Sequence, residues 1–264
     1  MLRVDGLNKT LPDGKQLLND VSFTVSPGEF VAILGASGAG KSLTLRCILG
    51  LTGITAGNVE FTDRDGHVHP ISRLRGAALR ASRTHMGVIF QGLNLVKRLR
   101  VIENVMVGRL GHINPVRSWL YGFTDDEAYL ALEALEKTRM AEHAHRFTGS
   151  LSGGEMQRVA IARAIYQQPD IYFADEPISS LDPGNAKAVM ELLAPLAKDR
   201  PVLGVFHQPE MVARYCTRAI AIKRGEIVYD GSPQIDQRML RDIYGSELHE
   251  IQHESHAEVT LQTA

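Results

Sequence analysis

The chain of 264 residues has few cysteines, few aromatic residues and almost no net charge. Two cysteines, Cys47 and Cys216, cannot make a disulfide framework, which favours a reducing compartment. A formal net charge of −1 gives no overall attraction to nucleic acid or anionic membranes. No run approaches the roughly 18 apolar residues of a membrane span, and no apolar signal segment opens the chain. We therefore expect a protein that is soluble by itself.

A glycine-rich loop follows the first fully apolar run of the sequence. Phe30–Leu34 predicts a buried strand, and a helical pattern follows the loop. The spacing G-x-x-x-x-G-K-[ST] is met by Gly35, Ala36, Ser37, Gly38, Ala39, Gly40, Lys41 and Ser42, with Leu43 next. The glycines allow backbone N–H groups to point at a phosphate, and the helix N-terminus adds partial positive charge.

Two side chains of this loop have the chemistry for a nucleoside triphosphate. Lys41 is predicted to reach the β- and γ-phosphates, and the Ser42 hydroxyl to hold Mg²⁺. The alternative is a glycine-rich turn that binds nothing. Because strand, loop, lysine, serine and helix all occur in the required order, the sequence favours nucleotide binding.

A pair of carboxylates, Asp175 and Glu176, ends the apolar strand predicted at Ile171–Ala174. Neighbouring strand residues point to opposite faces, so the two cannot do the same work. Asp175 is predicted to hold Mg²⁺ opposite Ser42, and Glu176 to orient and deprotonate an attacking water. Two solvated acids at a strand end are the alternative, which the phosphate loop makes less favoured.

A third element, Leu151–Glu155, begins a helix. Ser152 and Glu155 have capping-box spacing, so an ordinary helix start is one interpretation. Gly153 and Gly154 cost roughly 1 kcal/mol each against alanine in a helix. Such glycines leave bare N–H groups facing outward, which is typical of an anion site.

The Leu-Ser-Gly-Gly sequence before a Gln-Arg helix, followed by Asp175-Glu176, resembles the signature of the ATP-binding cassette ATPases. Three further landmarks of that family occur in order. Gln91 follows the strand after the predicted β-subdomain, Asp182 ends the loop Ser180-Leu181-Asp182, and His207 ends the strand Val202–Phe206.

The resemblance implies an α/β fold. Its P-loop core would carry an antiparallel β-subdomain and an α-helical subdomain inserted at about residues 92–168. The ATPase domain would span residues 1–245, leaving residues 246–264 as a flexible tail. From periodicity and capping signals we expect helices at Ile71–Ser82 and Val101–Leu110.

The resemblance also implies a head-to-tail homodimer with ATP and Mg²⁺ between its copies. ATP would lie between the phosphate loop of one copy and Ser152, Gly153 and Gly154 of the other. His207 would contact the γ-phosphate from its own copy. Gln91 would reach Mg²⁺ and the attacking water, and Asp182 would meet the partner near its phosphate loop.

A narrower likeness is to the phosphonate-import branch. It rests on Val101–Val105, Gly108–Gly111, the stretch up to Trp119, His207-Gln208 and Val228–Gly231. It implies docking to transmembrane permease subunits at the cytoplasmic face of the bacterial inner membrane, and indirect work with a periplasmic solute-binding protein. The cargo would be a phosphonate, phosphite or hypophosphite.

Three rival functions stay open. One is import of another small solute such as phosphate, an amino acid or a metal. A second is a cassette ATPase acting on nucleic acid, to which arginines at 73, 75, 80 and 83 would contribute, although a solvated face is favoured and we expect no nucleic-acid partner. The third, a small-molecule phosphotransferase, leaves Ser152–Gly154 unexplained.

Two local features depart from the family pattern or lie outside it. An aromatic residue is usual near Lys9–Pro12 to stack on adenine, whereas the nearest candidate here is Leu11, with Phe23 as an alternative. His249, His253 and His256 would be a solvated tail rather than a metal site, because their spacing fits no closed site.

Overall fold

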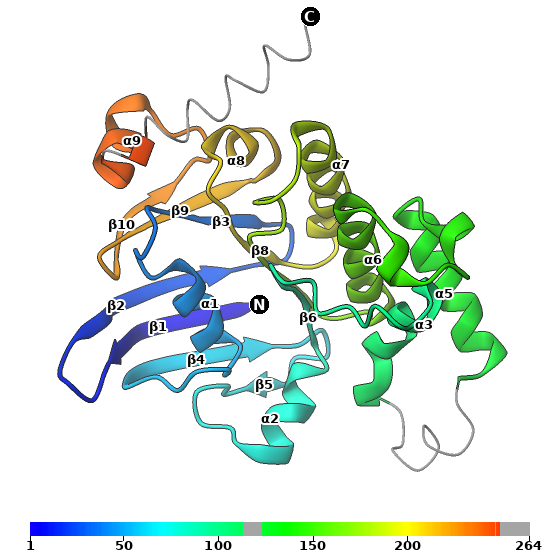
Figure 1. The fold of residues 1–264 in the computed structure, drawn as a ribbon. Helices are drawn as coiled ribbons and strands as arrows, with labels where there is room; N and C mark the ends of the chain where they lie inside the picture. Colours follow the sequence, from blue (N-terminus) through cyan, green and yellow to red (C-terminus); the bar gives the residue numbers. More distant parts are fainter. Residues whose placement is uncertain (113–122, 246, 249–264) are drawn as a thin grey trace, which may run out of the picture.

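The structure is a computed structural model that describes residues 1–112, 123–245 and 247–248. It contains an antiparallel sheet beside a mostly parallel sheet, with helices on both sides of the latter and a separate group of helices at one end (Figure 1). The predicted α/β class is thereby confirmed. The histidines predicted to form a solvated tail lie outside the described residues.

The antiparallel sheet has the strand order β2-β1-β4-β5. Its strands are β1 (Leu2–Thr10), β2 (Gln16–Val25), β4 (Ala56–Thr62) and β5 (Val68–His69). Buried and less buried residues alternate along β1 and β2, as expected for strands with one face on the core. This sheet is the predicted β-subdomain.

The core sheet has the order β10-β9-β3-β8-β7-β6 and is parallel except for β10. Its strands are β3 (Phe30–Leu34), β6 (Met86–Ile89), β7 (Ile171–Asp175), β8 (Val202–Val205), β9 (Arg218–Lys223) and β10 (Glu226–Gly231). The near-continuous apolar character of β3 and β7 fits strands that are covered on both faces. Since β3 is central, the loop that follows it leaves the middle of the sheet.

The helices alternate with these strands or form the separate group. The α-helices are α1 (Lys41–Ile48), α2 (Gly76–Arg83), α3 (Val101–Met106), α5 (Asp125–Lys137), α6 (Gly153–Tyr166), α7 (Pro183–Leu193), α8 (Pro209–Tyr215) and α9 (Gln237–Tyr244). The 3-10 turns are η1 (Val107–His112), η2 (Ala141–His143), η3 (Thr148–Ser150) and η4 (Ala194–Lys198).

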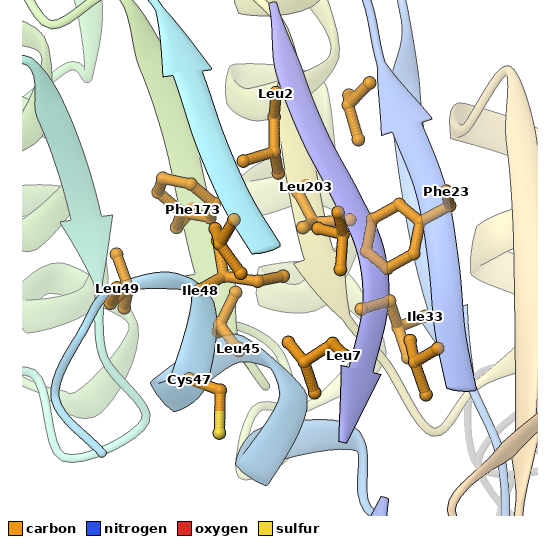
Figure 2. Close-up of a cluster of buried hydrophobic side chains, with 14 of the residues drawn as sticks. Leu2, Leu7, Phe23, Ile33, Leu45, Cys47, Ile48, Leu49, Phe173 and Leu203 are labelled. Atoms are coloured by element: carbon orange, nitrogen blue, oxygen red, sulfur yellow. The ribbon is translucent and has the colours of Figure 1, made fainter. Parts of the chain in front are cut away.

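Three buried clusters divide the core. The first joins α1, the antiparallel sheet and one face of the core sheet, and Figure 2 shows Leu7 and Phe23 beside Ile33 and Leu45 within it. The second lies on the other face of the core sheet, under α7, α8 and α9. The third belongs to α3, α5 and α6. This third cluster is consistent with the predicted helical insertion at about 92–168, whose boundaries stay a prediction.

Two predicted helices have different bounds in the structure. The helix predicted at Ile71–Ser82 begins only at Gly76, because residues 71–73 form a turn and Arg75 is extended, with φ of −142° and ψ of 162°. The helix predicted at Val101–Leu110 changes to a 3-10 turn after Met106. There Gly108 lies so close to α6 that a Cβ atom would be 2.6 Å from the carbonyl oxygen of Arg163.

Candidate functional site

The loop between β3 and α1 can exist only with glycine at certain positions. Gly35 has φ of +148°, and a Cβ atom there would lie 2.2 Å from the carbonyl oxygen of Ile222 in β9. Gly40 has φ of +109°, and its Cβ would meet Leu18 at 2.7 Å. Side chains are therefore excluded both by backbone conformation and by the neighbouring strands.

Lys41 folds back over this loop. Its Nζ donates to the carbonyl oxygens of Gly35 at 2.7 Å and Ala36 at 2.9 Å, and the residue is 5% exposed. Burial lowers the pKa of Lys41, while the carboxylates of Glu176, Glu247 and Asp175 act in the opposite direction. The ammonium group thus closes the loop on itself, and an incoming phosphate has to replace these carbonyl contacts.

Ser42 and Asp175 meet at the carboxyl end of the core sheet. The Ser42 hydroxyl donates to Oδ1 of Asp175 at 2.9 Å. In β7 the alternate residues Ile171 and Phe173 face the cluster that contains α1, so Asp175 continues on the same face. Burial raises the pKa of Asp175, and the Ser42 hydrogen bond partly offsets this. A hydroxyl beside a carboxylate is the hard oxygen donor set that suits Mg²⁺.

Glu176 is held from two directions. Its Oε2 accepts a hydrogen bond from Nε2 of Gln91 at 2.9 Å, and its Oε1 lies 2.7 Å from Nε2 of His207. Its φ is +50°, an uncommon conformation for a residue other than glycine and typical of strained functional positions. The structure therefore brings together the three side chains predicted to be catalytic, although they come from three different strand ends.

A cavity of about 360 Å³ lies over the phosphate loop. Its lining residues are Leu17, Ser37, Gly38, Gly40, Lys41, Ser42, Leu43, Glu176 and His207. The phosphate loop and the Glu176 carboxylate thus line the same cavity. Ser152, Gly153, Gly154 and Asp182 are not among these lining residues.

Ser152 caps α6 as the sequence predicts. Its hydroxyl oxygen lies 3.4 Å from the backbone nitrogen of Glu155, whose carboxylate accepts hydrogen bonds from the Ser152 backbone at 2.7 Å and hydroxyl at 2.8 Å. These bonds lower the pKa of Glu155. The helix start is therefore formed before any ligand arrives, and Ser152 is exposed.

The two glycines that follow Ser152 have different surroundings. Gly154 is buried, and a Cβ atom there would lie 2.6 Å from Oδ1 of Asn185, so packing against α7 accounts for this glycine. Gly153 is exposed, and a Cβ atom there would have nothing within 4 Å. Packing within the described chain therefore does not explain Gly153.

Asp182 caps α7. Its Oδ1 accepts from the backbone N–H of Asn185 at 3.0 Å, and its Oδ2 accepts from Nδ2 of Asn185 at 2.6 Å. These hydrogen bonds lower the pKa of the exposed Asp182 carboxyl. Asn185 also lies against Gly154, so the Asn185 side chain links Asp182 to the start of α6.

Phe23 is wrong as an alternative adenine-stacking residue. It is 6% exposed and packs within the first core cluster, where Figure 2 shows it facing Leu7 and Ile33. The aliphatic side chain that does line the cavity is Leu17 at the start of β2, which the sequence reasoning missed. The alternation of buried and less buried residues along β2 could have indicated it, because Leu18 is buried and its neighbour Leu17 therefore points the other way.

Glu247 is a second residue that the sequence reasoning missed. Its Oε2 accepts a hydrogen bond from the backbone N–H of Ser37 in the phosphate loop, at 2.9 Å. The neighbouring Leu248 is 4% exposed and belongs to the second core cluster, which anchors this segment. No motif in the sequence connects positions so far apart.

The chain is similar to known proteins over most of its length. Residues 18–179 match the family model described as ABC transporter. A phosphonates import ATP-binding protein from Stutzerimonas stutzeri is 45% identical over 94% of this chain and 90% of its own length. One from Nitratidesulfovibrio vulgaris is 43% identical over 93% and 92%, respectively. The likeness to the phosphonate-import branch is confirmed.

Solved structures agree with these relatives. A bacterial ABC transporter cassette solved as a dimer is 31% identical, with a TM-score of 0.75 over 89% of this chain and 100% of that one. A dimeric cassette in a post-hydrolysis state bound to ADP and phosphate has a TM-score of 0.74 and the same identity. Within the described residues, no helix has the length and apolar composition to cross a membrane. The chain belongs to the ABC transporter family, in which it is an ATP-hydrolysing cassette.

Proposed function

We propose that this ATPase drives the import of a phosphonate or a reduced phosphorus oxyanion such as phosphite or hypophosphite. The support is that relatives named phosphonates import ATP-binding proteins match it over nearly their whole length. In this proposal the chain docks to transmembrane permease subunits at the cytoplasmic face of the inner membrane. A periplasmic solute-binding protein delivers the cargo to those subunits.

The observation that carries the proposed chemistry is the placement of Glu176 at the cavity over the phosphate loop. The loop N–H groups and Lys41 bind the β- and γ-phosphates of ATP, which requires Lys41 to leave the carbonyl oxygens of Gly35 and Ala36. Glu176 takes the proton of the attacking water. Gln91 and His207 hold the two oxygens of that carboxylate and so fix its orientation before ATP binds.

The proposed metal ligands are Ser42, Asp175 and, once it leaves Glu176, Gln91. All three offer oxygen atoms, and the first two are already in contact at 2.9 Å. When bound, Mg²⁺ would neutralise charge on the phosphate oxygens during hydrolysis. Because the Ser42 hydroxyl donates its proton to Asp175, its oxygen lone pairs remain available for the metal ion.

A head-to-tail homodimer completes the proposed site. Ser152 and the N–H groups of Gly153 and Gly154 approach the γ-phosphate of the partner copy, and Asp182 approaches its phosphate loop. Gly153 is exposed, and a Cβ atom there would meet no described residue within 4 Å, which supports this arrangement. Equal contributions from two identical copies give two equivalent sites.

The test is reconstitution of the ATPase with its permease subunits in vesicles that contain the binding protein. We expect methylphosphonate, phosphite or hypophosphite to stimulate ATP hydrolysis several-fold. Glu176→Gln should bind ATP but hydrolyse it roughly 10²–10⁴-fold more slowly, the usual weight of a general base. Stimulation only by inorganic phosphate, an amino acid or a metal would show that this solute is the cargo instead. Near-normal hydrolysis by the Glu176→Gln variant would reject Glu176 as the base.

A further inference from the structure

A cluster of histidines and carboxylates lies away from the nucleotide cavity, where the antiparallel sheet meets the core sheet. Asp63 follows β4, His69 ends β5, and His85 directly precedes β6. One ligand atom from each of these three residues lies within 4.8 Å of the others. Figure 1 labels the strands next to which these residues lie in the sequence, β4, β5 and β6.

His69 has a polar neighbour at each ring nitrogen. Its Nδ1 lies 3.1 Å from the Ser82 hydroxyl oxygen, and its Nε2 lies 3.0 Å from Oδ2 of Asp63, a distance at which a ring N–H donates to the carboxylate. In the tautomer protonated at Nδ1, the Ser82 oxygen can accept that proton, and Nε2 has a lone pair for a metal ion that would replace the hydrogen bond to Asp63.

His85 is oriented in the manner of a metal ligand. Its Nδ1 lies 2.8 Å from Oδ2 of Asp170, and the other oxygen of that buried carboxylate pairs with Arg64. A carboxylate that accepts one ring N–H leaves the other ring nitrogen free to bind a metal, and this pairing is common around zinc. The rings of His85 and His69 have centroids 4.9 Å apart.

Asp63 supplies the negative charge. Its Oδ1 accepts the backbone N–H groups of Asp65 at 3.0 Å and His67 at 2.9 Å, while its Oδ2 faces His69 at 3.0 Å and the exposed His67 imidazole at 3.4 Å. The Asp63 side chain is only 3% exposed, whereas those of His69 and His85 are 20% and 32% exposed. The site is thus rigid on the carboxylate side and open to ions on the imidazole side. Hydrogen bonds from His69 and the backbone keep the pKa of Asp63 well below its usual range.

We propose that Asp63, His69 and His85 bind a divalent zinc-type cation. Two imidazoles and one carboxylate suit zinc, whereas Mg²⁺ prefers oxygen ligands alone. Ligands on one zinc ion with bonds of about 2.0–2.1 Å lie roughly 3–3.5 Å apart, so small rotations of the two partly exposed rings would complete the site. The bound ion would tie the β4–β5 turn to the first residue before β6 and so join the two sheets.

The experiment uses the full chain with His249, His253 and His256 replaced by glutamine in every sample, and excess Mg²⁺ throughout. Zn²⁺ is titrated calorimetrically, and Co²⁺ is followed by its visible absorption. We expect one ion per chain and a melting temperature that rises with zinc. His69→Gln or His85→Gln should weaken zinc binding at least about 100-fold, and Asp170→Asn about 10–100-fold. The exposed His145→Gln is the matched control and should change nothing.

A second measurement needs no variant. Diethyl pyrocarbonate modifies accessible imidazoles, and mass spectrometry locates each product. Zinc should protect His69 and His85 while leaving His145 reactive. Absence of zinc binding, or binding that is equal in the His69 and His85 variants, or protection elsewhere only, would overturn the proposal and leave only the His69–Asp63 hydrogen bond in its place.

Discussion

The phosphate loop and the start of α6 have the same glycine-rich chemistry but opposite surroundings. The loop is enclosed by its own chain: Lys41 is bonded to its carbonyl groups, and Gly35 has no room for a side chain. The start of α6 is exposed at Ser152 and Gly153, and no part of the described chain contacts the space where a Cβ of Gly153 would lie.

This difference separates two reasons for glycine. Gly35, Gly40 and Gly154 are required by close neighbours within the chain, so a monomer explains them. Gly153 is the first residue of α6, and among the described residues it has no such neighbour. An unexplained glycine at a helix N-terminus is consistent with the proposed partner phosphate.

The largest expected effect comes from blocking the start of α6, which is the exposed half of the proposed site. Ser152→Arg places a long cation where the partner's nucleotide would lie. We expect ATP binding to the isolated chain to stay intact, because the cavity is lined by other residues, and hydrolysis to fall at least about 100-fold. Nucleotide binding is measured by fluorescence titration and hydrolysis by phosphate release.

The matched control is Ser232→Arg, which adds the same charge at an exposed serine next to the edge strand β10. It should hydrolyse ATP at the normal rate. Normal hydrolysis by Ser152→Arg as well would show that the start of α6 does not approach a nucleotide, and the two-copy site would have to be abandoned.

The sequence predicted those parts of the site that depend on local spacing. The loop spacing, the capping box of Ser152 and Glu155, and the acidic pair at the end of β7 are all short-range patterns, and the structure has each of them in the expected element. The sequence also predicted Asp175 opposite Ser42, and in the structure the two residues are in contact. The roles assigned to these residues stay predictions.

The parts that the sequence could not give depend on packing between distant segments. Phe23 has the right chemistry for stacking, but the pleat of β2 turns it into the core. The 3-10 turn after Met106 follows from the close approach of Gly108 to α6, which no local pattern reveals. The Glu247 contact with Ser37 likewise depends on how the chain returns after α9.

Alanine substitutions at Gly153 and Gly154 test the two reasons for glycine separately, with smaller expected effects. Gly154→Ala should lower the free energy of unfolding by about 1–2 kcal/mol, because its Cβ would displace Asn185. Gly153→Ala should leave stability unchanged or slightly raised, yet lower hydrolysis roughly tenfold by crowding the partner's phosphate. Urea unfolding and phosphate release measure the two quantities. A Gly153→Ala protein with full activity would show that the bare N–H surface has no ligand.

The smallest expected effect concerns Glu247. Its carboxylate occupies the N–H of Ser37, a loop group that would otherwise be free for a phosphate. ATP therefore has to displace a charge-assisted hydrogen bond, whose net worth at an exposed site is about 1 kcal/mol. Glu247→Ala should lower the dissociation constant for ATP about 3–10-fold, and Glu247→Gln by less, since the amide oxygen still accepts from Ser37. Titration of a fluorescent ATP analogue measures both.

Asp242→Asn on α9, which removes an exposed carboxylate from the same part of the chain, should leave the affinity unchanged. Weaker binding by Glu247→Ala would mean that this carboxylate holds the loop in its binding shape instead of competing with phosphate.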